Sequence, residues 1–188
     1  MRLLRPDHTL LPGYLAALDR GFLPSNVDGA RIAAEHRGLI ARDAAAFLAL
    51  LHNPQGRGPL IRLPDGSHVP RLPGIQHWLW DEEFLGFMAL RWQPGTAELP
   101  QHVLGHIGYA VVAWRRGEGI ATRGLTLLLE HAREQHLPHV ELTTDPDNTA
   151  SHGVITRNGG VLVERFQKAP AYGGTEALRW RILLPSRR

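Results

Sequence analysis

The stretch Gly105–Glu130 constrains the fold most, because its hydrophobic pattern changes from that of a strand to that of a helix. Ile107, Tyr109 and Val111 alternate with small residues, which predicts a strand. A basic turn with two glycines follows, and beyond it apolar residues recur at helical spacing: Ala121, Leu125, Leu128, Leu129 and Ala132. Unpaired N–H groups at a helix start, next to glycines that allow close approach, suit phosphate oxygens. The stretch therefore predicts a strand–loop–helix unit that binds phosphate.

Two common phosphate motifs do not fit this turn. The P-loop needs a lysine after its second glycine, and the GxGxxG pattern is incomplete in Gly117–Thr122. Arg116–Ala121 instead fits Q/R-x-x-G-x-G/A at every fixed position, and here the chain resembles the GNAT superfamily of acetyl-CoA-dependent N-acetyltransferases. The family's second signature, N-x-x-A/S after the next strand, is matched by Asn148–Ser151. The segments GHIGYAV, TTDPDNTAS and NGGVL, together with Trp78 and Arg91, are similar to uncharacterised predicted bacterial acetyltransferases.

The resemblance covers about residues 70–185 and implies both a fold and an activity. The fold it implies is α/β, with a mixed, mostly antiparallel central sheet, splayed parallel strands, and helices on both faces. The activity it implies is transfer of an acetyl group from acetyl-CoA to a primary amine of a small molecule or a protein. A second hypothesis stays open, in which a GNAT-like domain binds acyl-CoA with little catalysis, as a sensor or an interaction module.

The resemblance also assigns residues to the acyl-CoA site. Groups of the central strand, the glycine loop and the later helix would hold the pantetheine arm and the pyrophosphate: Val111, Arg116, Gly117, Glu118, Gly119, Ile120, Ala121, Thr122, Asn148 and Ser151. Asn148 also has a local explanation, since Asn at this position caps a helix. A plain strand-to-helix turn is likewise the alternative explanation of the glycine loop.

The catalytic residues are less defined, because one departure from the family pattern affects them. Many GNAT enzymes carry a tyrosine seven residues after the motif Asn, where it protonates the departing thiolate, but Ile155 stands here. Ser151 is a candidate to substitute for it, and Tyr109 lies on the same strand face as Val111. His106 titrates near neutrality and is a candidate base, although packing against a neighbouring strand explains it as well.

Composition argues against several function classes. The chain has 188 residues, a net charge of +3 and no cysteine, and all but one of its 21 basic residues are arginine. The arginines are spread along the chain, which does not favour a nucleic-acid interface. No apolar run is long enough to span a membrane and no signal peptide is recognised, so we expect a cytoplasmic protein, a monomer or a homodimer. The spacing of His131, His136 and His139 predicts no metal site.

We expect one acetyltransferase domain over residues 1–188, with a helical part and a loop over 1–70 and the sheet core with the acyl-CoA site over 71–185. Helices are predicted over 11–18 and about 30–51, the second with a break at Gly38. Residues 75–80 and 84–92 predict a hairpin. The remaining expected elements are a helix that ends near 136, strands over 139–144, 161–166 and 175–184, and a helix over 149–157.

Overall fold

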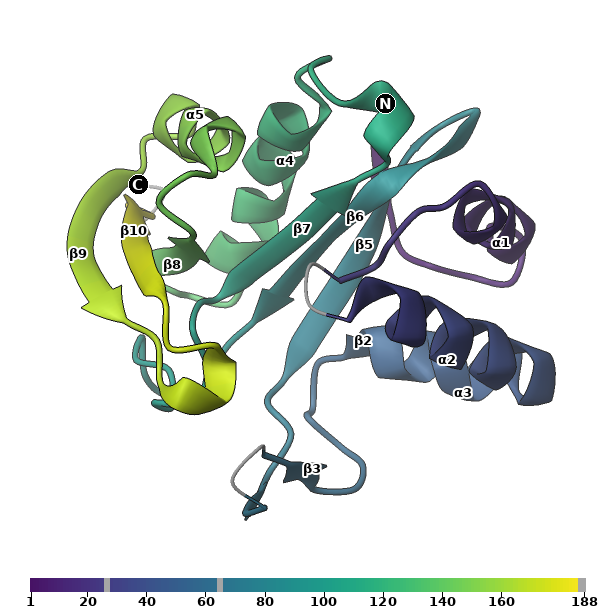
Figure 1. Cartoon of the computed structure of the whole chain (residues 1–188), viewed down its shortest axis with the longest axis horizontal. Coiled ribbons are helices and arrows are strands. Elements are labelled where there is room, and N and C mark those ends of the chain that lie inside the picture. The colour runs from purple at the N-terminus through teal and green to yellow at the C-terminus, as the bar shows by residue number, and fades with distance from the viewer. Residues whose placement is uncertain (26–27, 64–65, 186–188) are drawn as a thin grey trace.

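The computed structural model describes residues 1–25, 28–63 and 66–185, which form two main β-sheets with helices packed around them (Figure 1). The larger sheet has the strand order β1–β5–β6–β7, and β2 also pairs with β5. Its strands are β1 (Arg2–Leu4), β2 (His52–Asn53), β5 (Gly74–Asp81), β6 (Glu83–Arg91) and β7 (Ile107–Val111). The smaller sheet has the order β8–β10–β9, with β8 (His139–Thr144), β9 (Val161–Gln167) and β10 (Glu176–Leu183). A short hairpin, β3 (Ile61–Arg62) and β4 (His68–Val69), stands apart from both sheets.

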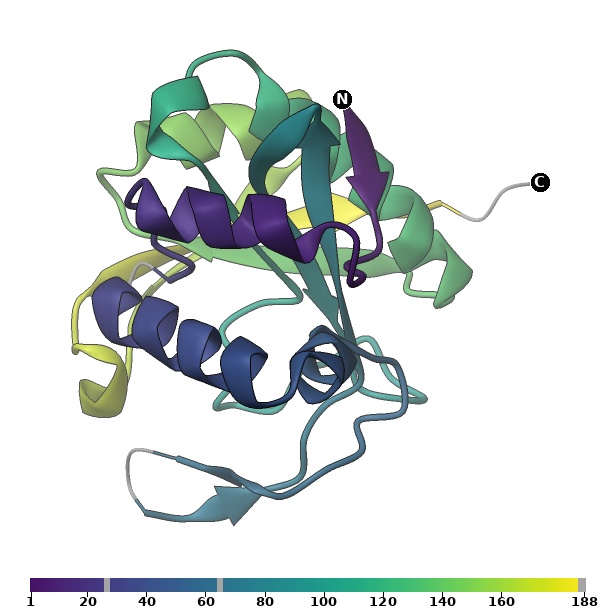
Figure 2. The same ribbon diagram turned by 90° about the vertical axis from the view of Figure 1, so that its right-hand side faces the viewer.

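Helices cover both faces of the larger sheet, as Figures 1 and 2 show. One face carries α1 (Leu11–Asp19), α2 (Gly29–Arg42) and α3 (Ala44–Leu51). The other face carries α4 (Ile120–Glu134), with α5 (Thr149–Arg157) beside it. Two short 3-10 turns complete the elements, η1 (Ala113–Arg115) and η2 (Pro170–Tyr172). The predicted fold class, a mixed α/β fold built on antiparallel sheets with helices on both faces, is confirmed.

The predicted hairpin supplies the centre of two hydrophobic cores. β5 and β6 pair antiparallel from Gly74↔Arg91 to Asp81↔Glu83, and Glu82 takes the left-handed conformation that the tight turn requires (φ 61°). Successive β5 side chains point to opposite faces, so Trp78 packs among α1–α3 while Leu79 packs under α4. Both side chains are fully buried. The hairpin therefore fixes α4, which follows the glycine loop, relative to the N-terminal helices.

The close approach of α4 to the sheet depends on a glycine inside the helix. A Cβ atom on Gly124 would lie 2.7 Å from Cδ2 of Leu79 and 2.7 Å from Cε of Met88. A larger residue there would push the helix away from β5 and β6. The glycine thus sets the distance between the sheet and the helix that begins at the glycine loop.

The prediction for the N-terminal part needs two corrections. The helical region 30–51 breaks at Asp43 rather than at Gly38, because the Asp43 carboxylate accepts a hydrogen bond from the Ala46 N–H (2.9 Å) and caps α3. Gly38 stays inside α2 with no atom near its Cβ position, so its cost is only the low helix propensity of glycine, about 1 kcal/mol. Strand β1, which pairs with the end of β5, was not predicted.

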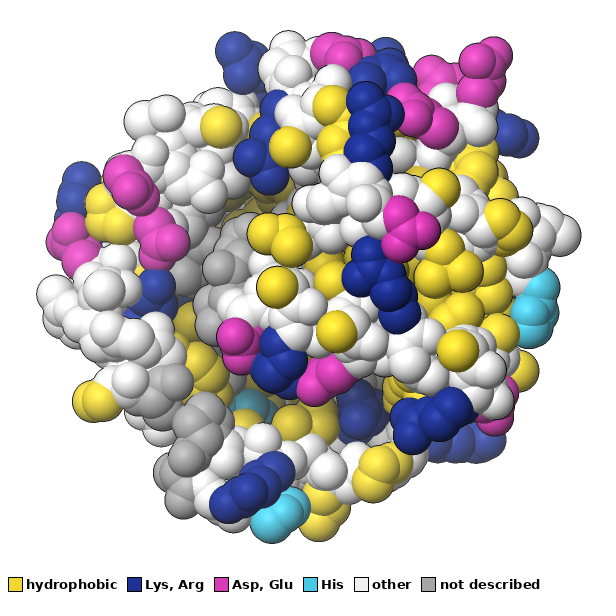
Figure 3. All heavy atoms as spheres, turned by 45° about the vertical axis from the view of Figure 1, so that its right-hand side comes forward, with side chains coloured by type: hydrophobic (Ala, Val, Ile, Leu, Met, Phe, Trp, Pro, Cys, Tyr) yellow, Lys and Arg dark blue, Asp and Glu magenta, His cyan; other side chains and the backbone are white. Residues whose placement is uncertain are grey.

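Charges of both signs are mixed on the surface. On the face shown in Figure 3, Lys and Arg side chains are spread among Asp and Glu side chains. No helix in the described ranges is both long and apolar enough to cross a membrane. The absence of a nucleic-acid partner and the single-domain organisation stay predictions.

Candidate active site

The two main sheets touch at one point and then part, and the site forms around this gap. The His106 N–H donates to the Glu141 carbonyl (2.7 Å), and the Glu141 N–H donates to Nδ1 of His106 (3.0 Å). The Thr143 hydroxyl also donates to the Leu104 carbonyl. Beyond these contacts no ladder of hydrogen bonds joins β7 to β8 in the described part of the chain. Backbone groups of β7 are therefore available on the side that faces the smaller sheet.

The first N–H groups of α4, which follow the glycine loop, have no hydrogen-bond acceptors among the described residues. Gly117 and Gly119 have φ values of 84° and 72°, in the left-handed region that favours glycine, and their Cβ positions face open space. No described residue accepts a hydrogen bond from the N–H groups of Ile120, Ala121 or Thr122. Four successive positions thus present a glycine cap and three free N–H donors, as an anion-binding helix start requires.

Charges around the loop favour an anion. Arg115 is neutralised by two carboxylates, Glu83 (2.8 Å) and Glu118 (2.9 Å). The hydrogen bond from Arg115 lowers the pKa of Glu118, so this carboxylate is charged and held by its partner. Arg116 has no carboxylate partner among the described residues, and its Nε donates to the Val111 carbonyl (3.3 Å). One uncompensated cation therefore sits between the end of β7 and the free N–H groups.

Side chains of α5 form the opposite wall. The Asn148 side chain accepts from the Ser151 N–H (3.1 Å), so the capping explanation of Asn148 is confirmed, while a role in ligand binding stays a prediction. The Tyr109 hydroxyl, from β7, is buried and forms no hydrogen bond of ordinary geometry. Burial raises the pKa of Tyr109, and the nearby Ser151 hydroxyl opposes this rise only in part. Tyr109 and Ser151, predicted separately, are thus brought together across the gap.

His106 joins the two sheets at the narrow end of the gap. Because Nδ1 accepts from the Glu141 N–H, the neutral ring carries its proton on Nε2, which is buried without a hydrogen-bond partner. Burial lowers the pKa of His106 to about 4, although the Glu141 carboxylate opposes the shift. In this arrangement neither ring nitrogen offers a free lone pair, so the geometry favours the packing explanation. A catalytic role for His106 stays a prediction.

Asn158, at the end of α5, connects the two walls of the site. Its side-chain amide donates to the Thr122 carbonyl (3.2 Å) in the first turn of α4, and its Oδ1 accepts from the Thr126 hydroxyl (2.8 Å). Asn158 therefore ties the end of α5 to the start of α4. Sequence spacing carries no signal for a contact between residues 36 positions apart.

The residue at the expected tyrosine position faces the core. Ile155 is fully buried, and a Cβ atom on Gly160 would lie 2.3 Å from its Cγ2. Its side chain belongs to the hydrophobic cluster that includes Leu178 and Trp180. A phenol at this position would have no room in the present packing.

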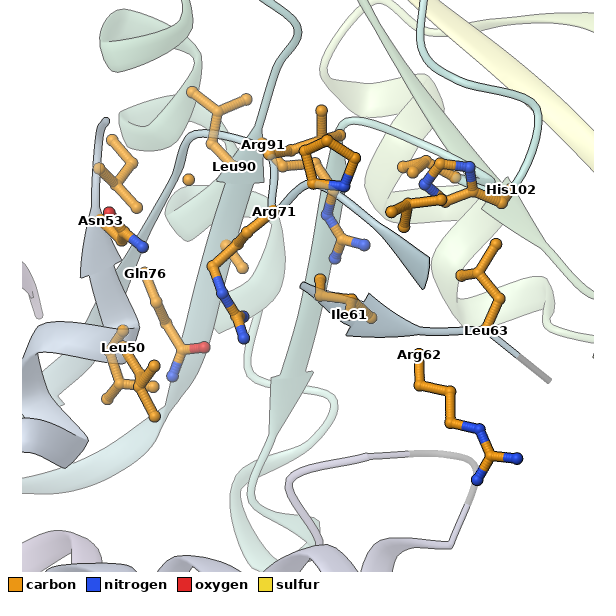
Figure 4. A pocket seen from close by; sticks show the side chains of 18 of the residues that line it. Leu50, Asn53, Ile61, Arg62, Leu63, Arg71, Gln76, Leu90, Arg91 and His102 are labelled. Carbon is orange, nitrogen blue, oxygen red and sulfur yellow. The ribbon is translucent and has the colours of Figure 1, made fainter. Parts of the chain in front are cut away.

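A cavity of about 490 Å³ opens near the other end of β7 (Figure 4). Its walls come from α3, the β3–β4 hairpin, the start of β5, the end of β6 and the loop before β7. Tyr172 closes one side, where its hydroxyl donates to the His102 carbonyl (3.1 Å). A Cβ atom on Gly108 would lie 3.6 Å from Nη2 of Arg91, a cavity residue. The cavity and the glycine loop therefore adjoin opposite ends of β7.

Comparison with known proteins decides the family. A family model described as the acetyltransferase (GNAT) family matches residues 44–159, more than half of the chain. The chain belongs to the GNAT family of acetyltransferases. It is therefore an acyltransferase that uses acetyl-CoA as its co-substrate. No curated protein sequence matches the chain.

Solved structures share the GNAT fold at low sequence identity. RimL, a ribosomal L7/L12 α-N-protein acetyltransferase in complex with coenzyme A, is 16% identical, with a TM-score of 0.65 over 97% of this chain and 93% of that one. The microcin C7 self-immunity acetyltransferase MccE, in complex with acetyl-CoA and AMP, is 13% identical (TM-score 0.54, 97% and 91% covered). A mutant of the spermidine N-acetyltransferase SpeG from Vibrio cholerae is 12% identical (TM-score 0.54, 97% and 95% covered). These similarities concern the fold.

The described residues of this GNAT chain contain no group of three or more His, Asp or Glu side chains placed to hold a metal ion. Among the histidines considered in the sequence, His131 instead stacks on His77, with ring centroids 4.5 Å apart. His131 also lies 3.1 Å from the Glu134 carboxylate.

Proposed function

We propose that the chain transfers the acetyl group of acetyl-CoA to a primary amine of a small molecule or a protein. The observation that carries the proposal is the gap between β7 and β8, which has free N–H donors at one end and two hydroxyls, of Tyr109 and Ser151, on its walls. Family membership supplies the reaction class. The acceptor would enter from the cavity at the other end of β7.

In this proposal the glycine loop holds the pyrophosphate. The N–H groups of Ile120, Ala121 and Thr122 donate to it, and Gly117 and Gly119 allow its close approach. Arg116 contributes charge, whereas Glu118 contributes only backbone because Arg115 holds its carboxylate. Ile120 likewise acts through its backbone, since its side chain is buried in the core. Val111, Asn148 and Ser151 border the path of the pantetheine arm.

Acetyl-CoA supplies a thioester: the amine nitrogen forms a bond to the acetyl carbon, the C–S bond breaks, the nitrogen loses a proton and the sulfur gains one. Backbone N–H groups of β7 can stabilise the charge that develops on the acetyl oxygen. The raised pKa keeps Tyr109 protonated at neutral pH, so its hydroxyl can donate a hydrogen bond to the developing thiolate. The Ser151 hydroxyl can both accept and donate a hydrogen bond, so it can connect the Tyr109 hydroxyl to solvent.

The test separates chemistry from binding. Tyr109→Phe and Ser151→Ala should each lower kcat by about tenfold or more, because a hydrogen bond to a charged group contributes about 1.5–3 kcal/mol. Acetyl-CoA affinity, measured by calorimetry, should change much less. Thiol release over a panel of amines gives the rates.

Tyr14→Phe is the matched control. It removes a buried phenol that is hydrogen-bonded to His36 among the N-terminal helices, and turnover should be unaffected. Unchanged kcat in both site variants would remove the two hydroxyls from the mechanism. Tight acetyl-CoA binding with no thiol release for any amine would support the sensor hypothesis instead, which the isoleucine at position 155 had favoured.

A further inference from the structure

Three arginines line the acceptor cavity, Arg62, Arg71 and Arg91, and no described carboxylate pairs with any of them. Arg71 and Arg91 both line the cavity, and Figure 4 shows their side chains reaching into it. Neither guanidinium forms a hydrogen bond or an ion pair with a described residue. The lining residues that the structure describes include no Asp or Glu. The described lining of the cavity therefore carries net positive charge.

Arg91 lies beside β7, the strand that borders the proposed site of acetyl transfer. It is the last residue of β6, and its guanidinium covers Gly108 of β7. Its side chain is exposed to solvent, and protein atoms near the guanidinium remove part of its water shell. This partial desolvation lowers the pKa of Arg91, although a guanidinium stays charged at any physiological pH.

Arg71 lines the cavity from the loop before β5. Its Nε is buried without a hydrogen-bond partner, near the Cβ position of Gly58 (3.7 Å). Figure 4 shows its guanidinium next to the amide end of Gln76, which also lines the cavity. Because no described carboxylate pairs with Arg71, the other nitrogens of its guanidinium are left to donate to a ligand oxygen.

Other partly buried arginines of the chain show the usual solution. Arg115, Arg133, Arg179 and Arg181 have side chains that are 30–37% exposed, and each pairs with a glutamate at 2.6–2.8 Å. Pairing provides carboxylate oxygens for most donors of these guanidinium groups, although Nε of Arg179 also lacks a hydrogen-bond partner. Arg71 is likewise half-buried, but no described carboxylate pairs with it, and it lines the cavity where an acceptor would bind.

We propose that the acceptor amine carries an anionic group, a carboxylate or a phosphate, which Arg91 and Arg71 bind. This inference rests on the proposed acetyl transfer. The cavity volume suits a small molecule or the terminal residue of a peptide. Apolar lining residues, among them Leu51, Ile75 and Leu90, would contact the part of the acceptor between the amine and the anion. Polycationic amines are disfavoured, because two like charges would face them without screening carboxylates.

The experiment compares acceptors that differ only in the group opposite the amine. The probes are δ-aminovalerate, aminopentanol with its amine and hydroxyl at opposite ends, cadaverine, and aminobutylphosphonate. In the unmodified protein, kcat/KM should be highest for one of the two anionic probes, and their ratio distinguishes carboxylate from phosphate-type recognition. Arg91→Gln and Arg71→Gln should each reduce kcat/KM for the preferred anion by about 10- to 100-fold. The rate with aminopentanol should change much less.

Arg62→Gln is the matched control. Arg62, in β3, also borders the cavity, but its side chain is exposed and Figure 4 shows it directed away from the other labelled residues. Its loss removes the same charge and should leave the preference for anionic probes unchanged. An equal loss in Arg62→Gln would overturn the assignment to Arg71 and Arg91. A preference for aminopentanol or cadaverine in the unmodified protein would overturn the inference while leaving acetyl transfer intact.

If no probe is acetylated, a binding assay tests the inference instead. Valerate and pentylphosphonate have the anion but no amine to acetylate, and pentylamine has the amine but no anion; the binding of each is measured by thermal shift in the presence of acetyl-CoA. Stabilisation by the anions that is lost in Arg91→Gln supports the inference. Failure of both anions to bind overturns it. Failure of acetyl-CoA itself to bind would instead refute the proposed function.

Discussion

Gly119→Ala tests whether the glycine loop holds the pyrophosphate of acetyl-CoA. Gly119 caps α4 with a φ of 72°, and a Cβ atom there would meet nothing within 4 Å. The substitution therefore strains the backbone without a clash, at a cost of about 1–2 kcal/mol. For a chain of this size, each kcal/mol lowers the Tm by about 2–4 °C. The variant should fold at ordinary temperature.

Gly119→Ala should weaken the binding of acetyl-CoA more than it lowers the free energy of unfolding. The new methyl group would stand in the space through which a phosphate approaches the free N–H groups of Ile120 and Ala121. Loss of one charge-assisted hydrogen bond costs about 1.5–3 kcal/mol, which raises Kd by about tenfold or more. Isothermal titration calorimetry with acetyl-CoA measures the change directly.

Gly21→Ala supplies the matched control. Gly21 follows α1, has a φ of 96° and also has no atom within 4 Å of its Cβ position. It carries the same kind of backbone strain at a distance from the glycine loop, so its Tm should fall by a similar amount while its Kd stays unchanged. If the two variants bind acetyl-CoA equally well, the loop is not the pyrophosphate site and the reasoning from free N–H groups fails.

Two further predictions concern buried groups. Burial lowers the pKa of His77 to about 4, so between pH 6.5 and 4 only the unfolded chain takes up the proton, and stability should fall with pH by up to about 3 kcal/mol. Urea unfolding at several pH values should show this loss, and His77→Phe should show less of it; equal slopes would contradict the prediction. Ile155→Tyr should lower the free energy of unfolding by about 1–3 kcal/mol through overpacking, without raising turnover. A faster enzyme with unchanged Tm would show that the helix can present a phenol after all.

Short-range patterns predicted the parts of the site that lie close together in the chain. The glycine loop, its flanking strand and helix, and the Asn148 cap all appear where the residues indicated, because their geometry follows from local backbone preferences and helix-end chemistry. The β5–β6 hairpin was predicted for the same reason. The break at Asp43 could be read from the sequence, because Asp is a common helix-capping residue, but the glycine at 38 was given too much weight.

Contacts between distant segments were decided by tertiary packing. Tyr109 and Ser151 were separate candidates until the gap between the sheets placed a β7 side chain beside α5. The placement of β10 between β8 and β9 has no local signature either, since any of the three strands could have been central.

The sequence by itself determined where a phosphate could bind and which family the chain resembles, because both depend on a few consecutive residues and their backbone conformations. Only the tertiary structure decided what surrounds the acceptor. Arg91 ends one strand and Arg71 lies in a loop 20 residues earlier, and nothing in their spacing joins them. Their shared cavity, and the absence of a carboxylate among its described lining residues, follow from how the hairpins and α3 pack together. Arginines are spread evenly along the sequence, but the tertiary structure places arginines without a described carboxylate partner together in one cavity.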